Sequence, residues 1–370
     1  MNIGIITHHT VINQGAVMQM YALKHWLEGK GNNVFILNYV KNFDFEPTEQ
    51  KRYNISIRSI PFFLKEYLVK KGVRLTWFNV KKQLLYRKYI SKNFIFKSYA
   101  LDNMDAVVVG SDEVFSLAVG CNMMMYGHGV NTDHLISYAP SFGQTDVARI
   151  EKFHCRELIA SGLKRFDKLS VRDTNSAEII KTLTGIKPTI VCDPVMLYDF
   201  RNEHADISRF HISGKKYLLV YSMDRWMVNP DEVNAIKTYA KKKGYITVSA
   251  GTFHKWCDRN IVCDPIEWLE IFRNAEEVIT DTFHGSVLSI ITNRPSFYYI
   301  RNLNSNKLMS LYKCFGLENR ILKKIDCHEI ERIASSSPID FNLINESLMK
   351  LRKASEEYLL EALLYVRGEV

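Results

Sequence analysis

The residues best suited to chemistry lie in the segment Val278–Ile290, which reads VITDTFHGSVLSI. It predicts an apolar strand that runs into a polar turn carrying Thr282, His284 and Gly285, followed by an apolar helix. A helix N-terminus has unpaired N–H groups and a partial positive charge, so such a turn is a natural site for a phosphate or carboxylate. His284 could exchange a proton there, or it could simply cap the helix or pack in the core.

Other polar loops follow predicted strands at residues 8–15, 110–113, 141–143 and 172–173. Asp112 comes after the apolar run Val107–Val109. It would stand at the mouth of a sheet as a base, or it would cap a helix. Arg172 offers a guanidinium for bidentate bonds to a carboxylate or phosphate, or for an ion pair with Asp173 or another surface acid. The recurrence of such loops at strand ends indicates a cleft that handles anions.

The elements that must position these loops alternate between strand and helix. A strand at 3–7, a helix at 17–30 and a strand at 34–40 predict a βαβ unit, with Gly31 ending the helix. Further strands are predicted at 106–109, 135–139, 169–172, 189–192, 217–221, 246–250, 277–280 and 296–300. This alternation is typical of doubly wound α/β folds, and 370 residues favour two such domains. Because ligands of these folds bind outside the carboxyl ends of the strands, we expect the site in the cleft between the domains.

The first domain boundary is expected after a charged amphipathic helix predicted at 146–164. This gives an N-terminal domain over 1–165, a C-terminal domain over 166–340 and a final helix over 341–370. Pro188 and Pro194 leave a later boundary open.

A helical insertion is expected in the first domain at about 55–95. Its stretch 65–88 carries eight Lys or Arg against one Glu, interleaved with Tyr67, Trp77, Phe78 and Tyr86. It is either a helix with a solvated basic face or a surface for a phosphorylated acceptor or an anionic membrane. No nucleic-acid-binding motif accompanies it, so nucleic acid is not an expected partner.

Composition describes an ordered globular protein, with 46% hydrophobic and 12% aromatic residues and a net charge of +9 that attracts anions. The N-terminus lacks the features of a signal peptide, and no apolar run approaches about 18 residues, so we expect a cytoplasmic protein. The seven scattered cysteines predict free thiols, and Cys257 and Cys263 near His254 fit no common zinc spacing.

Six segments in order resemble polysaccharide pyruvyltransferases, from about residue 3 to about residue 325. They are IGIITHHTVINQGAVMQMYAL, VVVGSDEVF, ISYAPSFG, LSVRDTNSAEIIKTL, the DP of CDPVML, and VITDTFHGSVLSIITNRPSFYY. The resemblance implies two Rossmann-like domains facing a cleft in a GT-B-like arrangement. It also implies phosphoenolpyruvate as donor and a hydroxyl pair of a polysaccharide or lipid-linked saccharide as acceptor, in capsule, exopolysaccharide or cell-wall assembly. The products are a pyruvate ketal and phosphate, and neither a cofactor nor a metal is implied.

The resemblance also assigns roles to residues. Arg172 would bind the carboxylate or phosphate of the donor, and His284 would lie against the same molecule. Because imidazole can donate a proton near neutral pH, we further hypothesise that His284 is the general acid. Residues beside His284 would touch the same donor, namely Thr282, Phe283, Gly285 and Ser286. The acceptor side of the cleft would include Asp112, Asn13, Gly15, Ser111 and Glu113. Apart from the resemblance, we hypothesise that Asp112 deprotonates the acceptor.

Two places depart from the family pattern. After Gly-Ser-Asp the family often continues Gln-x-Trp-Asn, whereas this chain has Glu113, Phe115 and Ser116, so acceptor recognition is expected to differ there. Thr282 stands where some members have Arg, so donor binding would depend more on Arg172 and on helix N–H groups.

Two other functions also fit the residues. A glycosyltransferase of the same architecture could hold the diphosphate of a nucleotide sugar at the strand–turn–helix around His284. A basic protein that binds nucleic acid or an anionic polymer without turnover would show salt-sensitive binding through residues 65–88.

Overall fold

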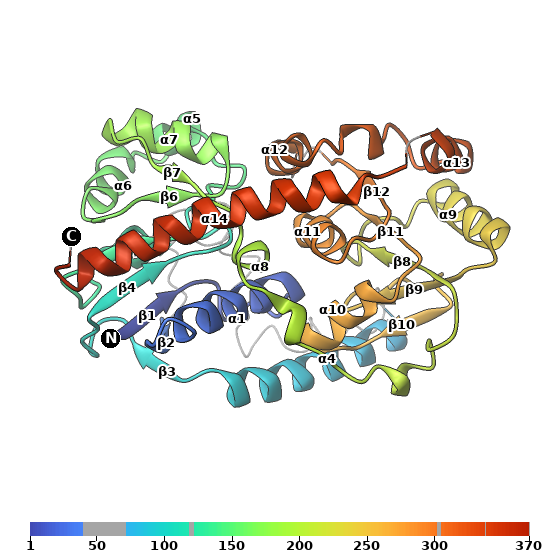
Figure 1. The fold of residues 1–370 in the computed structure, drawn as a ribbon, viewed down its shortest axis with the longest axis horizontal. Helices are drawn as coiled ribbons and strands as arrows, with labels where there is room; N and C mark the ends of the chain where they lie inside the picture. The colour runs from blue at the N-terminus through green and yellow to red at the C-terminus, as the bar shows by residue number, and fades with distance from the viewer. Residues whose placement is uncertain (40–71, 118–121, 302–304, 337, 370) are drawn as a thin grey trace.

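Two parallel sheets form the framework of the protein in a computed structural model that describes residues 1–39, 72–117, 122–301, 305–336 and 338–369 (Figure 1). The first sheet has the order β3-β2-β1-β4-β5. Its strands are β1 (Asn2–Ile6), β2 (Asn33–Asn38), β3 (Phe96–Ser98), β4 (Ala106–Val109) and β5 (Leu135–Ser137). Helix α1 (Gln14–Glu28) joins β1 to β2, and α4 (Gly72–Asn93) precedes β3.

The second sheet has the order β10-β9-β8-β11-β12-β13. Its strands are β8 (Tyr217–Tyr221), β9 (Ile246–Ala250), β10 (Arg259–Ile261), β11 (Glu277–Thr280), β12 (Ser296–Tyr299) and β13 (Ile321–Leu322). The helices of this unit are α9 (Pro230–Lys243), α10 (Pro265–Arg273), α11 (Phe283–Ile291), α12 (Ser305–Phe315) and α13 (Cys327–Ser336). Counted within its own unit, this sheet reads 3-2-1-4-5-6 and the first sheet reads 3-2-1-4-5, so both have the Rossmann strand order.

The predicted strands form, and most of them are buried on both faces, as parallel sheets require, whereas both residues of β7 (Thr189–Ile190) are exposed. In β4 and β8 every residue is buried. Strands β3, β10 and β13 were not predicted, because each has only two or three residues and lies at a sheet edge, where no period can be read.

The helix predicted over 146–164 is wrong as one element. The structure has α5 (Val147–Lys152) and α6 (Arg156–Leu163), separated at His154, whose φ of 52° lies in the left-handed region. A residue in that conformation cannot continue a right-handed helix, so the chain turns there.

The expected boundary at residue 165 is also corrected. Strands β6 (Ser170–Val171) and β7 (Thr189–Ile190) pair with each other, and the chain leading into β6 bonds to β5, with Ser137 N donating to Lys168 O at 3.0 Å. Residues up to 190 therefore extend the N-terminal layer, and we divide the units near residue 191. A helix end does not reveal which sheet the next strand will join, so the division falls in the later region that Pro188 and Pro194 left open.

Helix α14 (Phe341–Val366) lies across both units (Figure 1). It is tied to the first unit by Tyr358 OH, which donates to Ser137 O at 2.9 Å, and to the boundary segment by Ser355 Oγ, which accepts from Cys192 N at 2.9 Å. The final helix thus returns to the N-terminal half of the chain.

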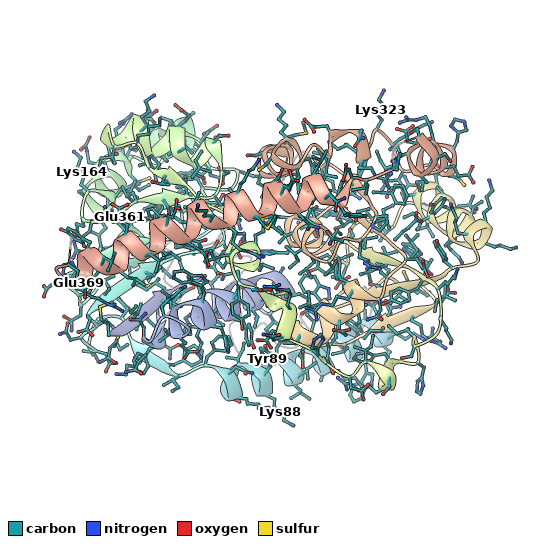
Figure 2. The ribbon with its side chains drawn as sticks, in the orientation of Figure 1. Lys88, Tyr89, Lys164, Lys323, Glu361 and Glu369 are labelled. Atoms are coloured by element: carbon teal, nitrogen blue, oxygen red, sulfur yellow. The ribbon has the colours of Figure 1, made fainter. Side chains whose placement is uncertain are left out.

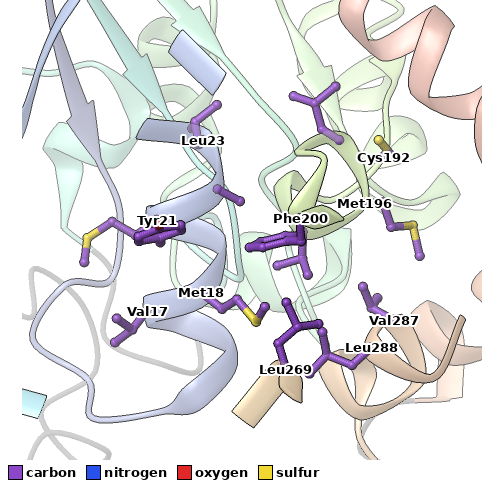
Figure 3. Packing of buried hydrophobic residues seen from close by; sticks show 14 of the residues in the cluster. Val17, Met18, Tyr21, Leu23, Cys192, Met196, Phe200, Leu269, Val287 and Leu288 are labelled. Atoms are coloured by element: carbon purple, nitrogen blue, oxygen red, sulfur yellow. The ribbon is translucent and has the colours of Figure 1, made fainter. Parts of the chain in front are cut away.

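One apolar cluster spans the two units. In Figure 3, Met18 of α1 packs close to Leu269 of α10 and Leu288 of α11, with Phe200 from the connecting segment beside them. Burial of a side chain of this size stabilises the fold by about 1.5–3 kcal/mol, so a shared core of this kind holds the units together. The polar loops above it are consequently fixed against each other.

Three other expectations concern the basic insertion, the cysteines and membrane-spanning helices. The basic insertion is described only from residue 72, where it forms α4, and residues 55–71, which include Tyr67, lie outside the described residues. Six described cysteines are free thiols, as predicted, and Cys121 lies outside that range. Across the described segments, no helix is long and apolar enough to cross a membrane.

Candidate active site

Arg172 is the centre of a cluster of charged side chains from both units. It follows β6, and its side chain is only 2% exposed. Its Nη1 lies 3.1 Å from Asp193 Oδ2, and its Nη2 lies 3.4 Å from Asp112 Oδ1. The guanidinium carbon lies 4.5 Å from the ring centre of Phe283. The arginine therefore pairs with two distant carboxylates rather than with Asp173, which instead caps α7 (Thr174–Thr184).

His284 lies in the first turn of α11 and faces the same cluster. Its Nε2 lies 3.6 Å from Asp193 Oδ2 and forms no hydrogen bond among the described residues. On the other side of the ring lies Gly15, where a Cβ would come within 2.1 Å of His284 Nδ1. Only glycine allows this approach between the two units.

The helix cap beside His284 is Thr282, whose Oγ1 accepts from Gly285 N at 3.1 Å. A capping role for His284 is thereby excluded. Gly285 itself has no room for a side chain, because a Cβ there would lie 2.3 Å from Thr280 Oγ1. Gly285 therefore lets the first turn of α11 pack closely against Thr280 at the end of β11.

The carboxylates of the cluster are held in their ionised form. Burial raises the pKa of Asp112, but the charges of Arg172 and His284 outweigh it and lower that pKa to about 2. Burial also raises the pKa of Asp193, and His284 and Arg172 again reverse the direction and lower it. Burial lowers the pKa of Arg172, whereas Asp112 and Asp193 raise it beyond its usual value. An ionised Asp112 with so low a pKa accepts hydrogen bonds well but is a weak base at neutral pH.

A second ion pair joins the units near the cluster. Lys307 Nζ of α12 lies 2.5 Å from Glu113 Oε1, and the two side chains are 19% and 23% exposed. Burial raises the pKa of Glu113, but Lys307 lowers it overall. The backbone oxygen of Glu113 lies 3.2 Å from His8 Nε2, so the loop after β1 contacts the loop after β4. Glu113 thus lies between the units, with its carboxylate already paired.

Three predicted contact residues shape loops instead of facing the cluster. Ser111 is fully buried and donates to Ala139 O at 2.8 Å. Ser286 is fully buried, donates to Thr282 O at 2.8 Å and lies 2.8 Å from Tyr312 OH. Both hydroxyls are thus bonded within the protein, and their contact with a ligand stays a prediction. The side chain of Asn13 caps α1 and accepts from Gly15 N at 2.9 Å, so it positions Gly15.

Phe115 and Ser116, where the chain departs from the family pattern, are both buried in the first unit. Phe115 stacks on Tyr126 with ring centres 5.1 Å apart. Its aromatic side chain therefore belongs to the core.

Sequence reasoning assigned no role to Asp193 or Lys307. Asp193 precedes Pro194 and caps the short helix α8 (Pro194–Leu197), so Asp-Pro after a strand is the available signal for a cap. No spacing shows that its other oxygen would reach Arg172. Lys307 is one of many lysines, and nothing in the sequence distinguishes it. Among the described residues, no group of three His, Cys, Asp or Glu could hold a metal ion.

Two Rossmann-like units that meet at a charged cluster define an α/β protein of the GT-B class, and solved structures share this fold. The chain resembles the S. aureus MnaA–UDP co-structure with a TM-score of 0.51 and 10% identity, over 100% of this chain and 97% of that one. It resembles the UDP-GlcNAc 2-epimerase from Neisseria meningitidis bound to UDP-GlcNAc with a TM-score of 0.53 and 8% identity, over 99% of this chain and 100% of that one. Likeness at such identities shows the fold alone.

The family model described as polysaccharide pyruvyl transferase matches residues 13–303. The chain belongs to this family, and the match includes the whole Asp112, Arg172, Asp193 and His284 cluster. No curated protein matches the chain.

Proposed function

We propose that this family member transfers the pyruvyl group of phosphoenolpyruvate to two hydroxyls of a saccharide, forming a ketal and releasing phosphate. The observation that carries the proposal is the buried fork of Arg172 between two ionised carboxylates, with His284 beside it where the two units meet. Such a fork suits the carboxylate or phosphate of the donor, and the imidazole suits proton transfer.

Donor binding would exchange one partner of Arg172 for another. The contact with Asp112 is longer than the contact with Asp193, 3.4 Å against 3.1 Å, and Asp112 is 22% exposed whereas Asp193 is fully buried. We therefore expect a donor oxygen to displace Asp112 and leave Asp193 in place. The released Asp112 would accept a hydrogen bond from an acceptor hydroxyl. Because Asp112 is a weak base, its proposed role is to orient this hydroxyl.

The chemistry then needs one acid and two hydroxyls. Protonated His284, which would form an ion pair with Asp193, gives its proton to C3 of the donor and leaves a cationic centre at C2. The first hydroxyl adds to C2 and its proton returns the imidazole to the charged form. The C2–O bond to phosphate breaks, the second hydroxyl adds, and its proton leaves with phosphate. Arg172 would stabilise the negative charge on the departing phosphate.

We also propose that the protein acts in the cytoplasm and contacts the inner face of a membrane, where lipid-linked saccharides are available. Four exposed apolar residues of α4 recur at helical spacing on one face, namely Val73, Trp77, Val80 and Leu84. Lys88 of the same helix points outward in Figure 2. An apolar stripe with flanking cations is typical of helices that lie on anionic membranes.

The rival function is transfer from a nucleotide sugar, because the N-terminus of α11 could also hold a diphosphate. Calorimetry separates the two with phosphoenolpyruvate beside a panel of nucleotide sugars. The native chain should bind phosphoenolpyruvate, and Arg172→Lys, which keeps the charge but loses the fork, should weaken that binding about tenfold or more. Arg156→Lys in α6 is the matched control, because this half-buried arginine pairs with Glu151 outside the cluster, and it should leave the binding unchanged. Binding of a nucleotide sugar without phosphoenolpyruvate would overturn the proposal.

A further inference from the structure

A pocket of about 540 Å³ lies between α4 and the second unit, away from the Arg172 cluster. Its lining contains four cationic side chains, Arg74, Lys81, Arg209 and Arg259, and no acidic one. Aromatic rings form much of the remaining wall. This lining suits a ligand that has several negative charges and an attached apolar group or ring.

Three of these cations have no acidic partner among the residues that the structure describes. Arg209 pairs with Glu267 at 2.6 Å, whereas Arg74, Lys81 and Arg259 form no ion pair within the described ranges. Cations gathered around one pocket repel one another unless an anion lies between them. A ligand with two or three negative charges would balance this group.

The pocket is built on packed contacts between the units. Phe78 of α4 lies 5.4 Å from Phe253, ring centre to ring centre, and Lys82 Nζ donates to Gly251 O at 2.7 Å. Gly251 lies against Gln14, because a Cβ there would come within 2.3 Å of Gln14 Nε2. Gln14 adjoins Gly15, the residue that touches His284. A short series of contacts thus joins the pocket to the active site.

We infer that this pocket binds the diphosphate of a carrier-linked saccharide, the acceptor of the reaction proposed above, on which the inference rests. A diphosphate bonded to a sugar and a carrier has two negative charges, which match the unpaired cations better than one phosphate does. Trp77 both lines the pocket and belongs to the exposed apolar stripe of α4, at 59% exposure. An apolar carrier could leave the pocket along that stripe, whereas a nucleotide would remain inside against the aromatic walls.

The first test measures binding of inorganic pyrophosphate and of inorganic phosphate to the full chain by calorimetry at fixed ionic strength. The pocket variant is Arg74→Gln with Arg259→Gln, and the matched control is Arg87→Gln with Lys88→Gln, two exposed residues of α4 that do not line the pocket. We expect the native chain to prefer pyrophosphate, the pocket variant to bind it about tenfold more weakly or worse, and the control to change it less than about twofold. Thermal melting confirms that both variants fold.

If both double variants weaken pyrophosphate binding equally, the inference is overturned, because the loss would then follow from the lower net charge alone. Loss of pyrophosphate binding in Arg172→Lys with retention in the pocket variant would also overturn it, by placing the ligand at the active site. These measurements need neither phosphoenolpyruvate nor turnover. A chain that binds pyrophosphate in the pocket but never binds phosphoenolpyruvate would therefore refute the proposed reaction and leave the diphosphate site standing.

A second pair of probes identifies the carrier. UDP is tested by calorimetry, and vesicles of neutral lipid with and without a polyprenyl diphosphate are tested by flotation. Binding of the loaded vesicles that is lost in the pocket variant assigns a lipid carrier. Binding of UDP that is lost in the same variant assigns a nucleotide carrier. Failure of both probes in a chain that binds pyrophosphate would overturn the assignment to a carrier-linked saccharide.

Discussion

Two groups of cations in this molecule lie in opposite surroundings. Arg172 is 2% exposed and touches two ionised carboxylates and an aromatic ring. Arg74, Lys81 and Arg259 line an open pocket and have no acidic partner among the described residues. A buried charge must be paired, because desolvation costs several kcal/mol per ion, and pairing also fixes its direction. Open cations keep their hydration and attract anions without fixed geometry, so the first group suits chemistry and the second suits capture.

His284→Asn should remove most of the turnover and leave both groups of cations in place. The amide keeps approximate size and polarity but cannot donate the proton, so we expect kcat for phosphate release to fall about 10²–10⁴-fold. Binding of phosphoenolpyruvate and of pyrophosphate should both persist. An active variant would remove His284 from the acid role.

Gly15→Ala tests the contact between units in the active site. Alanine alone favours a helix over glycine by about 1 kcal/mol, but its Cβ would overlap the His284 ring. We expect kcat to fall about tenfold to a hundredfold through displacement of the ring. Gly29→Ala at the other end of α1 is the control, since its nearest neighbour would be 3.3 Å away. If the two variants have equal kcat, the ring is not held by Gly15.

Asp112→Asn tests whether the Arg172 cluster, unlike the pocket, makes the stability of the protein depend on pH. Because the pKa of Asp112 falls from 3.8 to about 2 on folding, its ionised form adds about 2 kcal/mol of stability at neutral pH. A depressed carboxylate pKa gives stability that is present above the unfolded pKa and lost as pH falls through the folded pKa. The difference in unfolding free energy between native and variant chains should therefore shrink between about pH 4 and pH 2. For Arg259→Gln, the difference in unfolding free energy from the native chain should not change over this pH range in the same denaturant titrations.

Glu113→Gln should have the smallest effect. Its partner Lys307 is 19% exposed, and partly exposed pairs contribute about 1 kcal/mol or less. A double-mutant cycle with Lys307→Gln, measured by denaturant unfolding at low and high salt, gives the pair energy. A pair energy that does not fall with salt would show that this contact resembles the buried Arg172 cluster.

Much of the site could be predicted because the residues around it follow apolar strands. Asp112, Arg172 and His284 each lie in the turn that follows a buried strand, and the apolar runs of these strands are visible in the sequence. The roles of Ser111 and Ser286 could not be predicted, because a hydroxyl at a strand end can face a ligand or bond to a neighbouring backbone. Which of these happens depends on partners such as Ala139 and Tyr312 that lie many residues away.

The sequence alone determined the alternation of strands and helices, the positions of the polar loops and the basic character of α4, since these follow from local periodicity and composition. The tertiary structure decided that Arg172 pairs with Asp112, 60 residues earlier, and with Asp193, 21 residues later. It also brought Gly15 against His284 and left three cations of the pocket without an acidic partner in the described part of the chain. These contacts depend on strand order and on the shared apolar core between the units, and no local pattern encodes either.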